Sequence, residues 1–256
     1  MKTKPKKSSE IQIMREAGRM LGEILAGLAE QVKPGVTTRE LDQWAEEKIR
    51  AYGAVPTFKG YQGYPASLCV SINEEVVHGI PSPKRRIKNG DIVGLDLGLT
   101  YMGYVADSAV TVMVGKVRPE VKHLVEVTKQ ALMTVISKLH AGMKVGDIGF
   151  IVQSIVEAEG FSVVRDLTGH GVGRQLHEFP QIPNYGEPDT GPRLVAGTTI
   201  AVEPMVNMGT WRVKVLKDGW TVVTADGKPS AHWEHSLVVW EDHTEILTKR
   251  PDWSKV

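Results

Sequence analysis

The stretch DIVGLDLGLTYMGYVADSAVTVMV, residues 91–114, places two aspartates inside strongly apolar sequence. Its arms, 91–99 and 104–114, have the character of buried strands, and the short segment between them predicts a β-hairpin. A charge in a buried strand is costly unless it is paired or bound to a cation. If residues whose numbers sum to 203 pair across the hairpin, Asp96 and Asp107 lie opposite each other, with Cβ atoms roughly 5 Å apart. That register predicts a cation between the two carboxylates.

Two more apolar stretches each carry one carboxylate and are also expected to be strands. Glu203 lies in TTIAVEPMV, residues 198–206, and Glu234 lies in HWEHSLVVW, residues 232–240. For any one of these acids the alternative is a place on an exposed strand face, because successive side chains point to opposite faces. If the acids converge, they repel one another, and divalent metal ions would relieve that repulsion.

An internal repeat supports convergence. The segment PGVTTRELDQWAEEKIRAYG, residues 34–53, resembles AGMKVGDIGFIVQSIVEAEG, residues 141–160, with a constant offset of 107 residues. The same offset carries Asp96 onto Glu203. Two halves that each supply a carboxylate at the same point of a repeated unit predict a pseudo-two-fold site between them.

Helical periodicity predicts four helices, with starts at Ser8 or Ser9, at Thr37, at Pro119 and near Asp147. The hydroxyl of Ser8 or Ser9 is expected to cap the first helix, and Asp147 is expected to cap the fourth. Thr37 followed by Glu40 indicates a capping box, and the first two helices should end near Pro34 and Gly53, the fourth at Gly160. The Gly- and Pro-rich segment 169–192 is typical of a loop. Further strands are expected around residues 68–73, 161–166, 211–216 and 220–225.

The order of these elements favours an α+β fold with a curved, largely antiparallel sheet backed by helices. Nothing in the composition marks a linker, so we expect residues 1–256 to form a single catalytic domain. Its repeated halves should cover about 8–118 and 119–245. The lysine-rich start, 1–7, is expected to be a disordered tail, with contact to an anionic partner such as ribosomal RNA as the alternative.

Composition sets the broad class of protein. The 256 residues carry a formal net charge of +1, which gives no argument for binding DNA or a membrane. A single cysteine, Cys69, excludes an intrachain disulfide and favours a reducing compartment such as the cytoplasm. No stretch approaches the roughly 20 apolar residues of a membrane span, and the start lacks the apolar run of a secretory signal.

The motifs resemble those of type I methionine aminopeptidases, metallopeptidases with the pita-bread fold. The resemblance runs from about residue 8 to residue 245 and rests on five motifs in order: SINEEVVHGIP, DIVGLDLG with ADSAVTVMVG, TGHGVGRQLHE, IAVEPM and HWEHSLVV. It implies that the metal ligands are Asp96, Asp107, His170, Glu203 and Glu234. In that pattern Asp107 and Glu234 bridge two divalent ions. Asp96 holds one ion, and His170 with Glu203 holds the other.

The resemblance also implies the chemistry. Oxygen and imidazole ligands suit Co, Mn, Fe or Zn ions, without choosing among them. A water that bridges the two ions would attack the scissile carbonyl. Glu203 would accept its proton, His177 would donate to the carbonyl, and His78 would contact the scissile amide. A hydrogen-bonded structural role is expected for the other histidines: His123, His140, His232, His235 and His243.

The substrate pocket implied by the resemblance accepts an unbranched thioether side chain. Its lining is expected to comprise Tyr61, Tyr64, Cys69 and Trp220, with His78 and His177 beside the scissile bond. For Tyr61 and Tyr64 the alternative is ordinary loop packing. Phe58 and Leu176 occupy positions where related enzymes can carry a cysteine and a phenylalanine, so the pocket shape is expected to differ.

The implied activity is hydrolysis: an aminopeptidase that removes the initiator methionine from nascent polypeptides, preferring a small second residue. We expect a cytoplasmic monomer whose partners are nascent N-termini and, as a further candidate, the ribosome. Only 33 residues separate His170 from Glu203, whereas type II enzymes insert a long segment there. Prolidases and aminopeptidases P carry a large extra N-terminal domain. An X-Pro hydrolase of the same fold is nevertheless the nearest alternative, followed by a non-catalytic binding protein.

Overall fold

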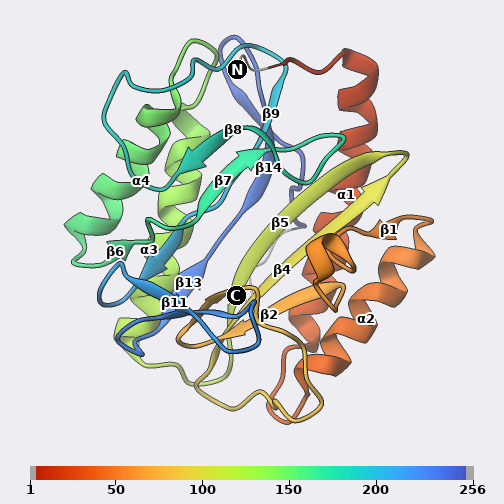
Figure 1. The fold of residues 1–256 in the computed structure, drawn as a ribbon, viewed down its shortest axis with the longest axis vertical. Helices are drawn as coiled ribbons and strands as arrows, with labels where there is room; N and C mark the ends of the chain where they lie inside the picture. Colours follow the sequence, from red (N-terminus) through yellow and green to blue (C-terminus); the bar gives the residue numbers. More distant parts are fainter. Residues whose placement is uncertain (1–3, 252–256) are drawn as a thin grey trace.

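A computed structural model describes residues 4–251. Its long helices form two pairs, one in each half of the chain, and lie on opposite sides of the strands (Figure 1). The helices are α1 (Ser8–Gln31), α2 (Thr38–Ala51), α3 (Pro119–Lys138), α4 (Val145–Ala158) and the short 3-10 helix η1 (Tyr61–Gly63). Within the described range, none of them combines the length and the apolar character that a bilayer span requires.

Every strand pair within residues 4–251 is antiparallel, which agrees with the largely antiparallel arrangement that the sequence predicted. β4 pairs with β1, β2 and β5; the largest sheet has the order β15-β14-β9-β7-β8, and two smaller sheets have the orders β13-β10-β6 and β11-β12-β3. The strands are β1 (Val55–Pro56), β2 (Leu68–Ile72), β3 (Glu75–Val77), β4 (Ile92–Tyr101), β5 (Tyr104–Met113), β6 (Ser162–Val163), β7 (Thr168–Gly171), β8 (Glu178–Pro183), β9 (Thr198–Val202), β10 (Met205–Asn207), β11 (Val213–Val215), β12 (Val222–Thr224), β13 (Ser230–His232), β14 (His235–Val239) and β15 (Thr244–Ile246).

The 107-residue offset recurs in the local structure. Helices α2 and α4 begin and end 107 residues apart. A glycine with positive φ precedes each helix, Gly35 at 92° and Gly142 at 98°, and another follows each, Gly53 at 71° and Gly160 at 77°. Only glycine adopts such angles without a steric penalty, so the repeated glycines set the same entry and exit for both helices.

The predicted helix starts are close to those observed, but two predicted caps were wrong. Helix α1 begins at Ser8, yet the residue that caps it is Lys7, whose backbone N–H donates to the Glu10 carboxylate at 2.8 Å. Asp147 is the third residue of α4 rather than its cap, and it accepts from the backbone N–H of Lys144 at 2.7 Å. In both helices a carboxylate one turn inside satisfies a free amide, which is half of a capping box.

The predicted hairpin register was wrong: each strand is shifted by one residue relative to the predicted pairing. Asp107 lies opposite Gly98, so Asp96 is its diagonal neighbour on the same face. The turn consists of Met102 and Gly103, whose φ angles are both positive, at 47° and 79°. Two-residue hairpin turns of this kind match the twist of the flanking strands. The diagonal arrangement still leaves both carboxylates on one face, with more space between them than direct pairing would give.

Three of the other predicted site residues lie in backbone settings that the sequence did not predict. Glu203, followed by Pro204, lies in a break between β9 and β10, and Glu234 lies in the matching break between β13 and β14. β9 pairs with β14, and β10 pairs with β13. Both segments of the chain therefore pass from one sheet to another at the same level. His170 lies on β7, at a register shift against β8, rather than in a loop.

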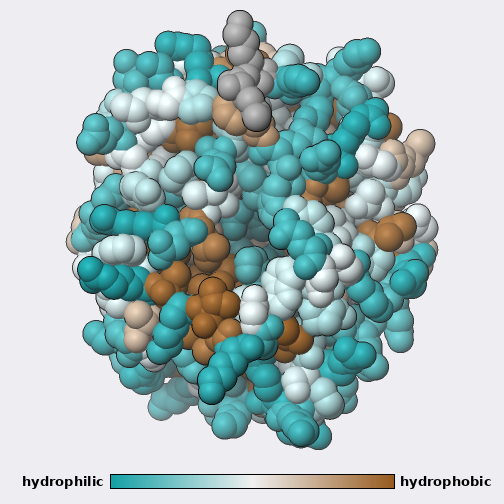
Figure 2. Space-filling view, viewed as in Figure 1, coloured by the Kyte–Doolittle hydropathy of each residue, from teal (hydrophilic) through white to brown (hydrophobic). Residues whose placement is uncertain are grey.

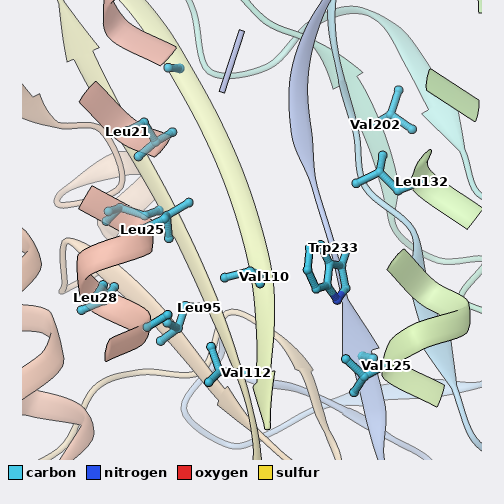
Figure 3. Packing of buried hydrophobic residues seen from close by; sticks show 14 of the residues in the cluster. Leu21, Leu25, Leu28, Leu95, Val110, Val112, Val125, Leu132, Val202 and Trp233 are labelled. Atoms are coloured by element: carbon cyan, nitrogen blue, oxygen red, sulfur yellow. The ribbon is translucent and has the colours of Figure 1, made fainter. Parts of the chain in front are cut away.

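Hydrophobic packing on both sides of β5 and β14 fixes these strands. Figure 3 shows Leu25 of α1 near Leu95 and Val110 in the first half. In the second half it shows Leu132 of α3 near Trp233. All five side chains are buried in a single hydrophobic cluster. The helices of each half therefore hold in place the strands that carry the acidic residues.

The predicted disordered tail is contradicted at Lys6. Its backbone N–H donates to the carbonyl of Gly197 at 2.8 Å, and its Nζ pairs with Glu178 at 2.7 Å. The half-buried carboxylate of Glu178 gives the charge a partner, which explains why this lysine lies against the protein rather than in solvent. The first three residues of the predicted tail lie outside the described residues.

Candidate metal centre and active site

Acidic residues from both halves line one pocket together with His170. Asp96 and Asp107 come from β4 and β5, whereas Glu203 and Glu234 come from the two strand breaks of the second half. The Nε2 atom of His170 lies 3.8 Å from Oδ2 of Asp107 and 3.5 Å from Oε1 of Glu203. Ligand atoms of Asp107, His170 and Glu234 all lie within 4.8 Å of one another. The structure thus brings the five predicted metal ligands together.

Several oxygens of this cluster lack hydrogen-bond donors. Oδ1 of Asp96, Oδ1 of Asp107 and Oε1 of Glu234 are buried and accept no hydrogen bond from any residue between 4 and 251. Buried oxygens of this kind are rare and need an explanation, such as a cation that the protein binds. Several carboxylate oxygens and one imidazole nitrogen form a donor set that suits a divalent ion. The residues therefore fit a metal centre.

The electrostatics of the acids point the same way. Burial raises the pKa of Asp96 to about 7 and that of Glu203 to about 8. Burial, reinforced by the neighbouring acids, raises the pKa of Asp107 and of Glu234 well above the ordinary range. Without a bound cation, the folded protein stabilises the protonated forms of these carboxylic acids. A bound cation would reverse that preference, because it stabilises the ionised forms.

His170 is neutral and turns a lone pair toward the acids. Its Nδ1 donates to the carbonyl of Gly171 at 2.9 Å, which leaves Nε2 unprotonated on the side of Asp107 and Glu203. Burial lowers its pKa to about 4, so the ring carries no charge near neutral pH. A hydrogen bond from the other ring nitrogen to a backbone carbonyl is the usual orientation of a histidine that binds metal.

Side-chain to backbone hydrogen bonds join the two halves beneath the cluster. The Ser236 hydroxyl accepts from the backbone N–H of Asp107 at 3.0 Å and donates to its carbonyl at 2.8 Å. The Ser108 hydroxyl donates to the carbonyl of Glu234 at 2.7 Å, and the backbone N–H of Glu234 donates to Ala109 at 3.0 Å. These bonds fix β5 against the break that carries Glu234.

A buried cation lies close to this junction. Arg250 donates to the Ser108 hydroxyl at 3.0 Å and to His235 Nε2 at 3.1 Å. Burial lowers the pKa of Arg250 to about 9, while the charge of Glu234 acts in the opposite direction. His235 in turn contacts the Thr248 hydroxyl through Nδ1 at 2.9 Å, so its ring points away from the pocket, as predicted.

Beside the acids the pocket is apolar and small, with a volume of about 160 Å³. A cavity of about 150 Å³ holds a molecule the size of benzene, so this one takes a single side chain. The Tyr64 and Trp220 rings meet edge to face with centroids 5.1 Å apart. The structure places all the predicted substrate residues, and both predicted departures, in its lining: Phe58, Tyr61, Tyr64, Cys69, His78, Leu176, His177 and Trp220.

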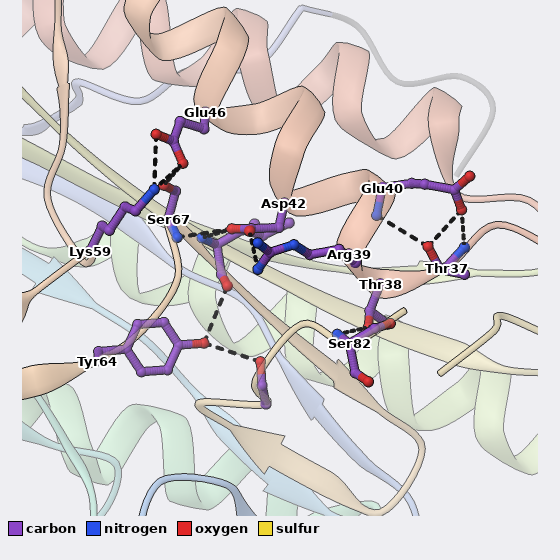
Figure 4. Close-up of polar contacts among 12 residues, drawn as sticks. Thr37, Thr38, Arg39, Glu40, Asp42, Glu46, Lys59, Tyr64, Ser67 and Ser82 are labelled. Atoms are coloured by element: carbon purple, nitrogen blue, oxygen red, sulfur yellow. Dashed lines mark hydrogen bonds and ion pairs between the residues drawn. The ribbon is translucent and has the colours of Figure 1, made fainter. Parts of the chain in front are cut away.

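Helix α2 supports one wall of this pocket (Figure 4). Asp42 accepts from the backbone N–H groups of Ser67 and Leu68 at 2.8 and 3.1 Å. These bonds fix the start of β2, the strand that carries Cys69, and the Tyr64 hydroxyl donates to the Leu68 carbonyl at 3.2 Å. The predicted capping box of α2 is confirmed: Thr37 N–H donates to the Glu40 carboxylate at 2.7 Å, and its hydroxyl accepts from Glu40 N–H at 3.2 Å.

Two further histidines stand at the rim. The His177 ring lies 4.4 Å from that of His170, centroid to centroid, and its Nδ1 is 2.8 Å from the Tyr61 hydroxyl. His78 has a φ of 60°, which is uncommon for a residue other than glycine and is concentrated at functional sites. Burial lowers the pKa of His78 to about 4 and also lowers that of His177. Both rings are therefore neutral near pH 7.

The sequence interpretation missed His232, which was given a structural role. Its ring is buried, and Nε2 lies 3.4 Å from Oε2 of Glu203. The signal was available, because His232 lies two residues before Glu234 and alternate residues of an extended chain share a face. It was overlooked because that spacing does not distinguish a site residue from a core residue.

A wider groove of about 530 Å³ leads away from the cluster. It shares His78, His177 and Glu203 with the pocket and continues along mixed polar and apolar side chains: Val77, Asp166, Leu167, Thr168, Gln181 and Met205. Figure 2 shows a hydrophilic hollow at the centre of one face, bordered by a hydrophobic patch. The groove provides room for the rest of an extended chain whose first side chain occupies the pocket.

Comparisons with known proteins agree with this geometry. The profile of metallopeptidase family M24 matches residues 12–241. The chain belongs to metallopeptidase family M24, and the metal requirement of that family agrees with the cluster of acids.

Within the family the similarity is to methionine aminopeptidases. The methionine aminopeptidase of Clostridium perfringens is 50% identical and covers 95% of this chain and 97% of its own. The crystal structure of the Thermotoga maritima methionine aminopeptidase has a TM-score of 0.95 at 46% identity, covering 97% of this chain and all of its own. A prolidase of Pyrococcus horikoshii, with a TM-score of 0.77 at 22% identity, covers 96% of this chain and 64% of its own, and shares the fold alone. The resemblance to methionine aminopeptidases and the α+β pita-bread fold are confirmed.

Proposed function

We propose that the protein hydrolyses the peptide bond that follows an N-terminal methionine. The observation that carries this proposal is a small apolar pocket, large enough for one side chain, directly beside the cluster of acids and His170. A reactive centre at the mouth of a pocket for one side chain suits cleavage after the first residue of a chain. Similarity to methionine aminopeptidases at about half of all positions supports the same assignment.

Five residues would hold two divalent ions. Asp96, Asp107, His170, Glu203 and Glu234 would supply the ligands. The unpartnered oxygens of Asp96, Asp107 and Glu234 support this assignment. When bound, such ions supply Lewis acidity and lower the pKa of a coordinated water toward neutrality.

Glu203 is the proposed proton acceptor. It stands within 3.5 Å of His170 at one oxygen, and it belongs to both the pocket and the groove. A carboxylate in this position can take a proton from water and later pass it to the departing amine. Its place at the junction puts it beside the bond that follows the first residue.

His177 is the proposed donor to the scissile carbonyl. If the Tyr61 hydroxyl donates to Nδ1 across the observed 2.8 Å, the proton of the neutral imidazole stays on Nε2. That N–H can then stabilise negative charge that develops on the carbonyl oxygen. His78, at the opposite rim, is proposed to contact the scissile amide.

The lining of the pocket is proposed to select methionine. Cys69 behaves as a small hydrophobe, and the Tyr64 and Trp220 rings can contact a thioether sulfur favourably. Buried Phe58 and Leu176 reduce the remaining space, which favours an unbranched side chain. A small second residue is expected to suit the junction between pocket and groove.

The cellular setting is also a proposal. We infer a cytoplasmic monomer, a single domain that acts on the N-termini of newly made chains, with the ribosome as a candidate docking partner. The one cysteine, buried at Cys69, agrees with a reducing compartment.

Peptide hydrolysis after chelation tests the proposal. The protein is stripped of metal, and Co, Mn, Fe or Zn ions are added back singly before incubation with Met-Ala-Ser, Leu-Ala-Ser or Ala-Pro-Ser. We expect cleavage of Met-Ala-Ser alone, and only with metal. Preferential cleavage of Ala-Pro-Ser would instead assign an X-Pro hydrolase, and no cleavage with any ion would indicate a binding protein.

A further inference from the structure

The most informative group outside the predicted site is the imidazole of His232, at the end of β13. The residue is only 3% exposed, and Nε2 has no hydrogen-bond partner among the described residues. Its closest ionic neighbour is Glu203, with 3.4 Å between Nε2 and Oε2. A buried imidazole nitrogen next to a carboxylate oxygen has an obvious partner, which a small rotation of either side chain would bring to hydrogen-bonding distance.

The backbone prevents this ring from moving away. His232 N–H donates to the Thr111 hydroxyl at 2.9 Å, and that hydroxyl donates back to the His232 carbonyl at 2.9 Å. His232 also lies opposite Met205 in the pairing of β13 with β10. Because Met205 is two residues beyond Glu203, one local unit of structure holds both members of the pair.

Two imidazoles therefore flank Glu203. His170 stands 3.5 Å from Oε1, and His232 stands 3.4 Å from Oε2. The oxygens are not equivalent, because His170 faces Oε1 with the lone pair of Nε2. His232 lies on the side of Oε2, away from the oxygen that faces His170. A ring on that side suits a donor to Glu203 better than a further metal ligand.

We propose that His232 is a positioning residue whose Nε2–H donates to Oε2 of Glu203. The bond fixes the rotation of the carboxylate, so that Oε1 faces the metal centre while Oε2 is held by the protein. This inference rests on the proposed role of Glu203 and adds a residue that sets its orientation. Partners that orient metal ligands typically contribute about 10- to 100-fold to metal affinity or activity.

The test compares His232→Leu with His232→Gln. Leucine removes the donor, whereas the glutamine amide has a similar reach and can donate to Glu203. Mn binding by calorimetric titration is measured for each protein, alongside kcat and KM for Met-Ala-Ser. We expect His232→Leu to lower Mn affinity and kcat about 10- to 100-fold with little change in KM, and His232→Gln to recover most of both. His232→Asn, whose amide is shorter, replaces the leucine variant if that variant does not fold.

A double-mutant cycle isolates the pair. In a Glu203→Ala background, the further change His232→Leu should leave Mn affinity unaltered, because the acceptor is already absent. Wild-type Mn affinity and turnover in His232→Leu would overturn the inference, as would a glutamine variant as impaired as the leucine one, which would indicate an imidazole ligand. If the wild type binds Mn but does not cleave Met-Ala-Ser, the proposed function fails, while the titrations still decide the role of His232.

Discussion

Without metal, the protein should lose stability as the pH rises from about 6.5, the ordinary pKa of histidine, to about 8.5, and bound divalent metal should remove that loss. The reason is that the folded state raises the pKa of Asp96 from 3.8 to about 7 and that of Glu203 from 4.5 to about 8. The folded state therefore binds these protons more tightly than the unfolded chain does. This stabilisation is fully present below pH 4 and is lost as the pH rises through the folded-state values. Below about pH 6.5 the buried histidines oppose the loss, because the folded state lowers the pKa of His78 and of His170 from 6.5 to about 4.

The expected size follows from Glu203. The rise in its pKa from 4.5 to about 8 corresponds to roughly 5 kcal/mol of free energy of unfolding in total, and about 2 kcal/mol of it is lost above pH 6.5, since one pH unit is worth about 1.4 kcal/mol. Asp96 interacts with Glu203, so its contribution is not simply added. For a protein of this size about 1 kcal/mol moves the unfolding midpoint by roughly 2–4 °C, so the Tm of the metal-free form should fall by on the order of 5 °C between pH 6.5 and 8.5.

The assay is thermal unfolding, followed by circular dichroism between pH 6.5 and 8.5, after chelator dialysis and with or without added Mn. We expect the stabilisation by Mn to grow with pH, because metal binding displaces protons from the acids. Asp107→Asn is the matched control: it removes one buried charge at nearly constant volume, so its pH dependence and its response to Mn should both shrink. A metal-free Tm that stays level or rises over this range would refute the reasoning, as would equal stabilisation by Mn at both ends.

Three further changes test separate parts of the site. Asp107→Ala should abolish turnover of Met-Ala-Ser while circular dichroism stays native; near-normal activity would remove this residue from the metal centre. Tyr61→Phe should lower kcat about 10-fold with little change in KM, because the 2.8 Å contact that fixes the ring of His177 is lost; an effect on KM alone would assign Tyr61 to substrate binding. Lys6→Met breaks the ion pair with Glu178, which is 24% exposed, and should cost about 1 kcal/mol, or roughly 2–4 °C of Tm; an unchanged Tm would show that this ion pair contributes nothing to stability.

The features that the sequence predicted best are those that depend on a single residue or on residues close together in the chain. The capping box of α2 requires only Thr37 and Glu40, three residues apart, and the structure contains it. The repeated glycines mark the ends of α2 and α4, because a positive φ is a property of the single residue. The acids were recognisable because charges rarely lie in apolar strands without a partner.

Features that depend on alignment between distant segments were not predictable in this way. The register of β4 and β5 depends on a turn with a positive φ at Met102, a residue type that gives no signal for such a turn, unlike asparagine or aspartate. The strand breaks at Glu203 and Glu234 arise only because β9 and β10 pair with strands of different sheets. The proposed role of His232 depends on this passage of the chain between sheets, so it could be recognised only from the structure.

A site built at the junction of two halves must hold like charges together before any metal binds. The bonds that do this are neutral: the hydroxyls of Ser108 and Ser236 join the backbones on which Asp107 and Glu234 lie. Arg250 adds one buried positive charge behind them, donating to Ser108. Since neutral bonds do not weaken as the acids ionise, the backbone of the junction should persist in the metal-free protein at high pH. Loss of stability there should therefore reflect the cost of the charges themselves rather than separation of the two halves.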